Sequence, residues 1–316
     1  MVGRLSLVLV LGFAVAAPAE AGRRTISLDG TWEMAEGGMD AAPAEFKNKA
    51  PVPGLADLDV RALVEAGVKE KDPRREAFWY RRTFAVDGPV PAVATLKLHK
   101  ARYGVKVFLN GQPVGERLPC FTPGYYDLRE HLKGDGQANE LIVRVGAART
   151  AVPETIPWGH DFEKIRYIPG IYDSVEVILC DAPQVVRVQA APDLAAKAVR
   201  VQALIRNAAQ AGETTVRCTV RPVGNVAGKG AADRPTAEPV GTATSAPLAL
   251  APGEERTVEL RVPIADCRLW SPEDPFLYEL ETATGADSLV VRFGMRSFAF
   301  DPQTKRPLLN GKPYFL

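Results

Sequence analysis

Apolar and polar residues alternate with a period of two along most of this chain. Phe78, Tyr80 and Phe84 share one parity. The same alternation recurs in residues 105–109, 141–145 and 175–179. It turns one face of a β-strand toward a core and the other toward solvent or a second layer. Because only the short segment 58–68 has helical spacing, the pattern predicts an all-β protein.

Turn-forming residues divide the predicted strands into two groups. Proline and glycine, 26 and 27 residues, interrupt the alternating runs at the spacing of β-sandwich domains. A boundary is predicted at residues 181–183, after which the strands become rich in Ala and Val. Residues 224–247 contain almost no large apolar side chain and are predicted to form a long loop. We therefore expect one sandwich over residues 22–182 and a second, smaller one over 183–300.

Two Asn-Gly pairs lie between apolar runs, which is the strongest short-range signal for a β-hairpin. The first pair is Asn110-Gly111 and the second is Asn310-Gly311. Residues 308–309 and 314–316 are expected to pair about the second turn. A strand that finishes on Phe-Leu would leave apolar side chains and backbone groups without a partner. We therefore expect a much larger domain to follow.

The charge balance argues against several classes of partner. Lys and Arg together number 39 and Asp and Glu 38, so the chain has no global field that attracts nucleic acid or an anionic membrane. The arginine pairs are isolated and do not form a basic stripe. Nucleic acid is therefore not expected as a partner.

The first 21 residues have the organisation of a signal peptide. Arg4 supplies a positive charge, a short apolar core follows, and residues 19–21 read Ala-Glu-Ala at the expected cleavage site. The core is shorter than the roughly 20 residues that a membrane-spanning helix needs. An uncleaved N-terminal anchor is the alternative. We expect an exported protein, periplasmic or secreted, with no membrane association after cleavage.

The four cysteines leave two interpretations open. Cys120 and Cys180 lie in the first half and Cys218 and Cys267 in the second, which would suit one disulfide in each domain of an exported protein. Buried free thiols fit the sequence equally well. Because the cysteines lack CxxC spacing and the chain has 3 histidines, no clustered zinc ligands are apparent. We expect neither a metal nor a cofactor.

Six segments, in this order and at these spacings, give the chain a family resemblance. They are residues 78–86, 107–116, 124–145, 167–179, 269–282 and 291–316. Together they resemble the non-catalytic front half of glycoside hydrolase family 2, which contains β-galactosidases, β-glucuronidases and β-mannosidases. The resemblance implies a jelly-roll, galactose-binding-like domain over 22–182 and an immunoglobulin-like sandwich over 183–300. It also implies that residues 301–316 begin a truncated (β/α)8 catalytic barrel.

The resemblance implies a function for the whole protein that this chain alone lacks. Such enzymes hydrolyse β-glycosides with two carboxyl groups, one protonating the leaving oxygen and the other attacking the anomeric carbon. Both belong to the barrel, so no catalytic residue is assigned here. The chain would support the barrel and contribute a loop to the sugar pocket. The alternative is an autonomous, lectin-like carbohydrate-binding protein.

Residues 157–175 are the segment expected to reach the sugar. By resemblance, a loop before the Gly-Ile-Tyr strand at 170–172 faces the barrel, and an acidic residue upstream of the glycine contacts substrate. His160-Asp161 resembles the motif in β-glucuronidase-like members, although the longer gap to Gly170 leaves Glu163 or Lys164 as alternatives. Trp158 could stack on a pyranose ring. The alternative is a solvated surface loop whose charges pair among themselves.

Other aromatic residues have both a binding and a structural interpretation. Trp79 and Tyr80 could form a sugar platform, but aromatic residues in an alternating strand usually belong to the core. Trp270 is expected at the hinge between the second sandwich and the barrel. Tyr125 and Tyr126 follow a Pro-Gly turn, and the sequence leaves binding and structural roles open for both.

Overall fold

A computed structural model describes residues 22–56, 76–102, 104–147, 151–156, 169–225 and 237–315. The predicted signal peptide and the segment of helical spacing, 58–68, lie outside these ranges. The described residues form β-strands joined by turns, with no α-helix among them, which confirms the predicted fold class. The described residues contain no helix with the length and apolar character needed to span a membrane.

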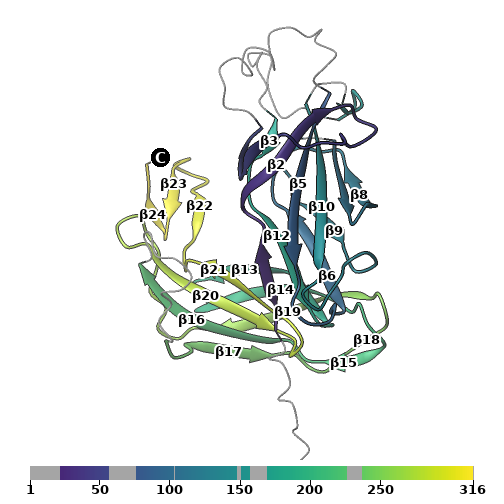
Figure 1. The fold of residues 1–316 in the computed structure, drawn as a ribbon. Helices are drawn as coiled ribbons and strands as arrows, with labels where there is room; N and C mark the ends of the chain where they lie inside the picture. Colours follow the sequence, from purple (N-terminus) through teal and green to yellow (C-terminus); the bar gives the residue numbers. More distant parts are fainter. Residues whose placement is uncertain are drawn as a thin grey trace, which may run out of the picture.

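The first sandwich is built from two antiparallel sheets (Figure 1). One sheet has six strands in the order β3-β2-β5-β10-β7-β8: Asn48–Val52, Gly30–Gly37, Ala77–Ala85, Ala138–Gly146, Val105–Leu109 and Gln112–Arg117. The other has four, β1-β12-β6-β9: Arg24–Ser27, Val175–Cys180, Val93–Leu98 and Gly124–Asp127. A short pair, β4 (Gly54–Leu55) and β11 (Gly170–Ile171), lies at the entry to β12.

The core of the first sandwich follows the predicted alternation. Phe78, Tyr80 and Phe84 of β5 are buried, and the Tyr80 ring lies edge-on to Trp32 with centroids 6.5 Å apart. Trp79 has the opposite parity and is also buried, because its ring packs 5.8 Å from Phe108 and its indole N–H donates to the Gly38 carbonyl. The structural interpretation of Trp79 and Tyr80 is therefore confirmed.

The second sandwich has seven main strands in sheets of three and four, the arrangement of immunoglobulin-like domains. The first sheet is β13-β14-β19: Gln184–Asp193, Ala198–Arg206 and Glu255–Pro263. The second is β17-β16-β20-β21: Gly241–Thr244, Arg217–Asn225, Phe276–Ala283 and Ser288–Phe293. A small ribbon of β15 (Gly212–Thr214) and β18 (Leu248–Leu250) completes it.

The prediction of one long loop over residues 224–247 is wrong at both ends. β16 continues through Asn225, and β17 pairs with it from Thr244↔Arg217 to Gly241↔Val220. Sequence patterning missed β17 because its residues, Gly-Thr-Ala-Thr, offer almost no apolar side chain to bury. β17 forms because its backbone pairs with β16 through hydrogen bonds, which an apolar pattern does not reveal.

The two hydrophobic cores are separate clusters of buried side chains. The last member of the first cluster is Leu179, and the first member of the second is Val185. All four cysteines are free thiols in this structure, with Cys180 and Cys218 buried. The structure therefore agrees with the interpretation that the cysteines are free thiols.

A small C-terminal sheet follows the second sandwich (Figure 1). Its strands are β22 (Phe298–Phe300), β23 (Pro307–Leu309) and β24 (Lys312–Pro313). Asn310 and Gly311 have φ of 51° and 77°, and Asn110 and Gly111 have 52° and 80°, so both predicted Asn-Gly turns are confirmed. The sequence predicts the second strand at 314–316, but the structure places it at Lys312–Pro313; the Tyr314 amide still donates to the Pro307 carbonyl of β23 at 2.9 Å.

Candidate functional site

The five residues predicted to contact sugar lie outside the described part of the chain. They are Trp158, His160, Asp161, Glu163 and Lys164. The structure does describe the residues at which this loop rejoins the first sandwich, from Pro169 to Tyr172. We call residues 169–172 the loop root.

Backbone hydrogen bonds hold the loop root on both sides. β11 pairs with β4, and the amide of Ala56 donates to the Pro169 carbonyl at 2.8 Å. On the other side, the amide of Arg102 donates to the Gly170 carbonyl at 3.1 Å. A β-carbon added to Gly170 would lie 2.3 Å from the Gly54 carbonyl oxygen, so this position requires glycine for the close approach of two backbones.

An aromatic pair lies beside the loop root. The rings of Phe121 and Tyr172 stack with centroids 5.7 Å apart and planes 25° apart. Phe121 is held at a φ of 59° and remains 48% exposed, while the amide of Tyr172 donates to the Lys100 carbonyl. An exposed aromatic face of this kind offers a stacking surface for the C–H face of a sugar ring.

The Cys120 thiol and the Tyr80 hydroxyl near this pair both keep their protons at neutral pH. Burial raises the pKa of the Cys120 thiol to about 11, although the nearby Arg102 guanidinium acts in the opposite direction. The thiol stays protonated near neutral pH and contacts the Ala101 carbonyl at 3.4 Å, so it is not an activated nucleophile. Burial, and secondly Tyr172, also raises the pKa of the Tyr80 hydroxyl.

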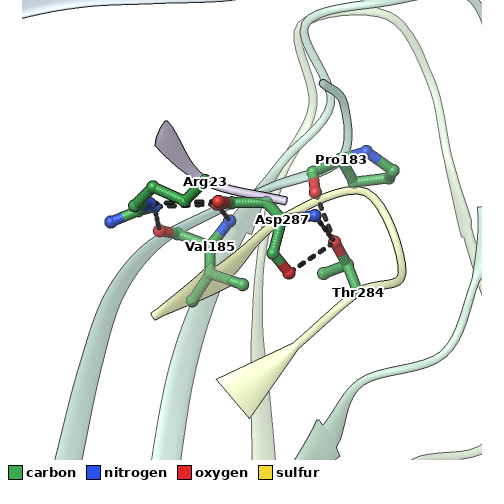
Figure 2. Close-up of polar contacts among 5 residues, drawn as sticks. All are labelled: Arg23, Pro183, Val185, Thr284 and Asp287. Carbon is green, nitrogen blue, oxygen red and sulfur yellow. Dashed lines mark hydrogen bonds and ion pairs between the residues drawn. The ribbon is translucent and has the colours of Figure 1, made fainter. Parts of the chain in front are cut away.

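A buried ionic cluster joins the two sandwiches (Figure 2). Arg23, just before β1, donates from Nε and Nη2 to the Asp287 carboxylate at 3.0 and 2.7 Å. Arg23 also donates to the Val185 carbonyl at 2.6 Å, and the Val185 amide donates to Asp287 at 2.7 Å. Beside it, the Thr284 hydroxyl donates to the Pro183 carbonyl. We call Arg23, Val185 and Asp287 the interdomain clamp.

The C-terminal sheet and the residues that follow it expose aromatic side chains. Phe298, Phe300 and Phe315 are 50%, 66% and 83% exposed, and the first two rings meet edge-on at 5.6 Å. Beneath the sheet, the Asn310 side chain donates to the Trp270 carbonyl, and the Arg296 guanidinium lies 4.4 Å above the Trp270 ring. Trp270 therefore packs where the second sandwich meets the C-terminal sheet.

Sequence reasoning missed the clamp and the exposed Phe121. Asp287 reads as a turn residue after Gly285, and Arg23 reads as the polar residue that follows a signal peptide. Their separation of 264 positions gives no local signal, because only the packing of two domains brings them together. Among the residues that the structure describes, no cluster of His, Cys, Asp and Glu could hold a metal ion.

A scan against protein-family models matches residues 184–296 to "Glycosyl hydrolases family 2". The matched segment begins with β13 and ends just after β21. The second sandwich is a family 2 glycosyl hydrolase domain. This match confirms the family resemblance found in the sequence.

Three solved structures share the fold of both sandwiches. A Bacteroides uniformis β-glucuronidase covers 92% of this chain with a TM-score of 0.68 and 21% identity. A family 2 β-galacturonidase from Eisenbergiella tayi, solved with galacturonate, covers 92% at a TM-score of 0.67 and 21% identity. A putative β-galactosidase from Bacteroides fragilis covers 92% of this chain with a TM-score of 0.68 and 18% identity.

The chain spans only part of each of these proteins. It covers 34% of the β-glucuronidase, 46% of the β-galacturonidase and 44% of the putative β-galactosidase. A search of curated proteins gave no match. The likeness at these identities concerns the fold, so activity and substrate are matters of proposal.

Proposed function

We propose that this chain is the non-catalytic N-terminal portion of an exported family 2 glycoside hydrolase that cleaves β-glycosides. The observation that carries the proposal is the family match over residues 184–296, joined to a shared fold over 92% of the chain in enzymes named for β-glycoside hydrolysis. A sugar-binding jelly roll, an immunoglobulin-like sandwich and a catalytic (β/α)8 barrel would make up the whole enzyme.

In this proposal the chain positions substrate and the barrel performs the chemistry. A retaining glycosidase needs two carboxyl groups about 5–5.5 Å apart, one acid and one nucleophile. Both would come from the barrel. The loop 157–168 would reach the sugar, with Asp161 accepting hydrogen bonds from hydroxyl groups and Trp158 stacking on the ring. His160, Glu163 and Lys164 are the neighbouring candidates for polar contact.

Two features of the described residues support this arrangement. The loop root, where the loop 157–168 ends, is fixed between β4 and residues 100–102 by backbone hydrogen bonds and so gives the loop a rigid base. The exposed Phe298 and Phe300 of the C-terminal sheet form an apolar surface of the kind that a neighbouring domain covers. The interdomain clamp would keep these two features at a constant separation.

The test begins with the gene. An open reading frame that continues beyond the Leu316 codon into a (β/α)8 barrel is expected. The protein encoded by that frame should hydrolyse aryl β-glycosides, and residues 22–316 alone should show no turnover above background. Turnover by residues 22–316 alone would refute the assignment of both carboxyl groups to the barrel.

The sugar-contacting role of the loop is tested in the barrel-bearing protein. Asp161→Asn should raise KM about tenfold with a smaller change in kcat, because it weakens hydrogen bonds made in both the bound and transition states. Glu154→Gln, an exposed carboxylate in the same connection, is the matched control and should change neither constant. Equal effects of the two substitutions would contradict the role given to Asp161.

A further inference from the structure

A groove of about 210 Å³ lies where the lower edge of the first sandwich meets the second. Its walls come from β6 and β9 of the first sandwich and from β13 and β14 and the turn after β14 in the second. The side chains that the argument uses are Thr95, Tyr125, Asp127, Arg129, Gln184 and Arg206. Ligand sites often form at such junctions of two domains.

The structure separates the roles of the two tyrosines that the sequence left open. Tyr126 points into the core of the first sandwich, where burial raises the pKa of its hydroxyl to about 12. Tyr125, on the other face of the same edge strand, is 61% exposed and lines the groove. Single exposed aromatic residues are common, so what matters is the polar groups gathered around this one.

A fixed pair of charged side chains lies on the same face of β9. Nε and Nη2 of Arg129 donate to the Asp127 carboxylate, and Nη1 donates to the Ala92 carbonyl at 3.1 Å. Three of the five N–H groups of the guanidinium are thus used, which leaves two to donate to a ligand. Because Arg129 bonds to both Asp127 and the Ala92 carbonyl, its two remaining donors are oriented before any ligand binds.

The second sandwich supplies further hydrogen-bonding groups. The Gln184 side-chain amide makes no hydrogen bond within the described part of the chain and lines the groove with the guanidinium of Arg206. Arg206 is paired with Glu255, and Arg129 with Asp127, so the charges around the groove cancel. An exposed aromatic ring among compensated, hydrogen-bonding groups matches an uncharged polyhydroxyl ligand better than an anion.

We propose that this groove binds a neutral β-linked oligosaccharide, with Tyr125 stacking on one sugar ring and Arg129 and Gln184 donating to hydroxyl groups. The proposed contacts come from described residues of both sandwiches, so this inference goes beyond the substrate loop proposed above. Such a site would hold a polysaccharide chain against the protein. The groove is smaller than the roughly 300–1,000 Å³ of pockets that enclose a ligand, so the sugar lies along the surface and binds weakly.

Calorimetric titration of the whole chain with neutral β-1,4-linked tetrasaccharides of glucose, galactose and mannose tests this. At least one should bind with a Kd of about 1 mM. Tyr125→Ala should weaken binding about tenfold, because it removes the stacking surface. Tyr125→Phe should retain it within about twofold, because the hydroxyl is not required for stacking. Since Tyr125 is exposed, both variants should fold, and circular dichroism checks this.

A substitution on the opposite wall shows whether both sandwiches take part. Gln184→Ala should weaken the binding of the same tetrasaccharide about threefold to tenfold, because one hydrogen bond is lost. Absence of saturable binding to every tetrasaccharide at about 10 mM, ten times the expected Kd, would overturn the proposal. It would also be overturned if Tyr125→Ala binds as the wild type does, or if oligosaccharides of uronic acids bind more tightly than the neutral ones.

Discussion

The Asp287 side chain has no solvent-exposed surface, so protein groups alone balance its charge. Arg23 supplies two N–H donors and the Val185 amide supplies a third. Taking a carboxylate and a guanidinium out of water costs several kcal/mol for each ion, which their attraction repays only when all their hydrogen-bonding groups are satisfied. Across the boundary between two domains, the clamp gives both carboxylate oxygens of Asp287 donors and three N–H groups of Arg23 acceptors.

Removing one partner of the clamp should be costly. Asp287→Ala leaves the largely buried Arg23 guanidinium without its counter-charge and should lower the free energy of unfolding by about 3 kcal/mol. Arg261→Ala, in the exposed pair with Asp193, is the control and should cost between about 0 and 1 kcal/mol. Urea unfolding measures both. Equal losses in the two variants would show that the clamp contributes no more than a surface ion pair.

Cys180 should make stability fall at alkaline pH. Burial, and secondly the Asp287 carboxylate, raises the pKa of its thiol from 9.0 to about 12. Above pH 9 the unfolded chain can lose this proton while the folded protein retains it, so the stabilisation is complete below pH 9 and is lost between pH 9 and 12.

The test compares Cys180→Ala with the wild type at several pH values. The variant should be less stable at pH 8 because of the cavity it creates, and this deficit should shrink by on the order of 1 kcal/mol by pH 10. Urea unfolding at each pH measures the difference between the two proteins. A deficit that stays constant from pH 8 to pH 10 would mean that the thiol titrates alike in the folded and unfolded states.

At the scale of elements, the two Asn-Gly hairpins use their asparagines in the same way. The Asn110 side chain accepts from the Glu140 amide and donates to the His131 carbonyl. The Asn310 side chain accepts from the Ser297 amide and donates to the Trp270 carbonyl. The turn signal predicted both backbones because it is local. It could not predict the neighbours, which come from other strands and loops.

The pairing of β11 with β4 depends on glycine at position 170. Gly170→Ala should lower the free energy of unfolding by about 1–3 kcal/mol, because its β-carbon would overlap the Gly54 carbonyl oxygen and push the two backbones apart. Gly212→Ala in β15 is the matched control, since the nearest atom to its added β-carbon lies 3.9 Å away. Thermal unfolding of the two variants should separate them clearly. Similar melting temperatures would contradict the close approach at Gly170.

At the scale of the whole molecule, two exposed aromatic side chains meet on the C-terminal sheet. The C-terminal sheet carries Phe298 and Phe300, 50% and 66% exposed, as an edge-on pair. An apolar surface of this kind is characteristic of contact with another domain or protein. It should therefore dominate the binding of apolar dyes and the self-association of the chain.

Replacing that surface should change its interactions without unfolding the protein. The double variant Phe298→Ser and Phe300→Ser should lose most of the binding of the dye ANS and should self-associate less in analytical ultracentrifugation. Phe121→Ser, with a ring of almost equal exposure beside the loop root, is the control and should leave both readouts unchanged. Dye binding that follows Phe121 instead would place the dominant apolar surface at the loop root.

The sequence by itself determined the local structure of this protein. Alternation predicted the buried faces of β5, β7, β10 and β12, and Asn-Gly pairs predicted two turns, because strand periodicity and positive φ are properties of a few adjacent residues. The family resemblance could also be recognised in the sequence, because it rests on motifs that follow one another in a fixed order along the chain. β17 escaped prediction because it has no apolar pattern.

Only the tertiary structure decided which distant residues meet. It joined Arg23 to Asp287, separated Tyr125 from Tyr126 by the two faces of an edge strand, and left the cysteines unpaired. It also stacked Phe121 on Tyr172 at the root of the predicted sugar loop. These contacts depend on how two sheets and two domains pack, and packing is set by the sum of many weak contacts between segments far apart in the chain.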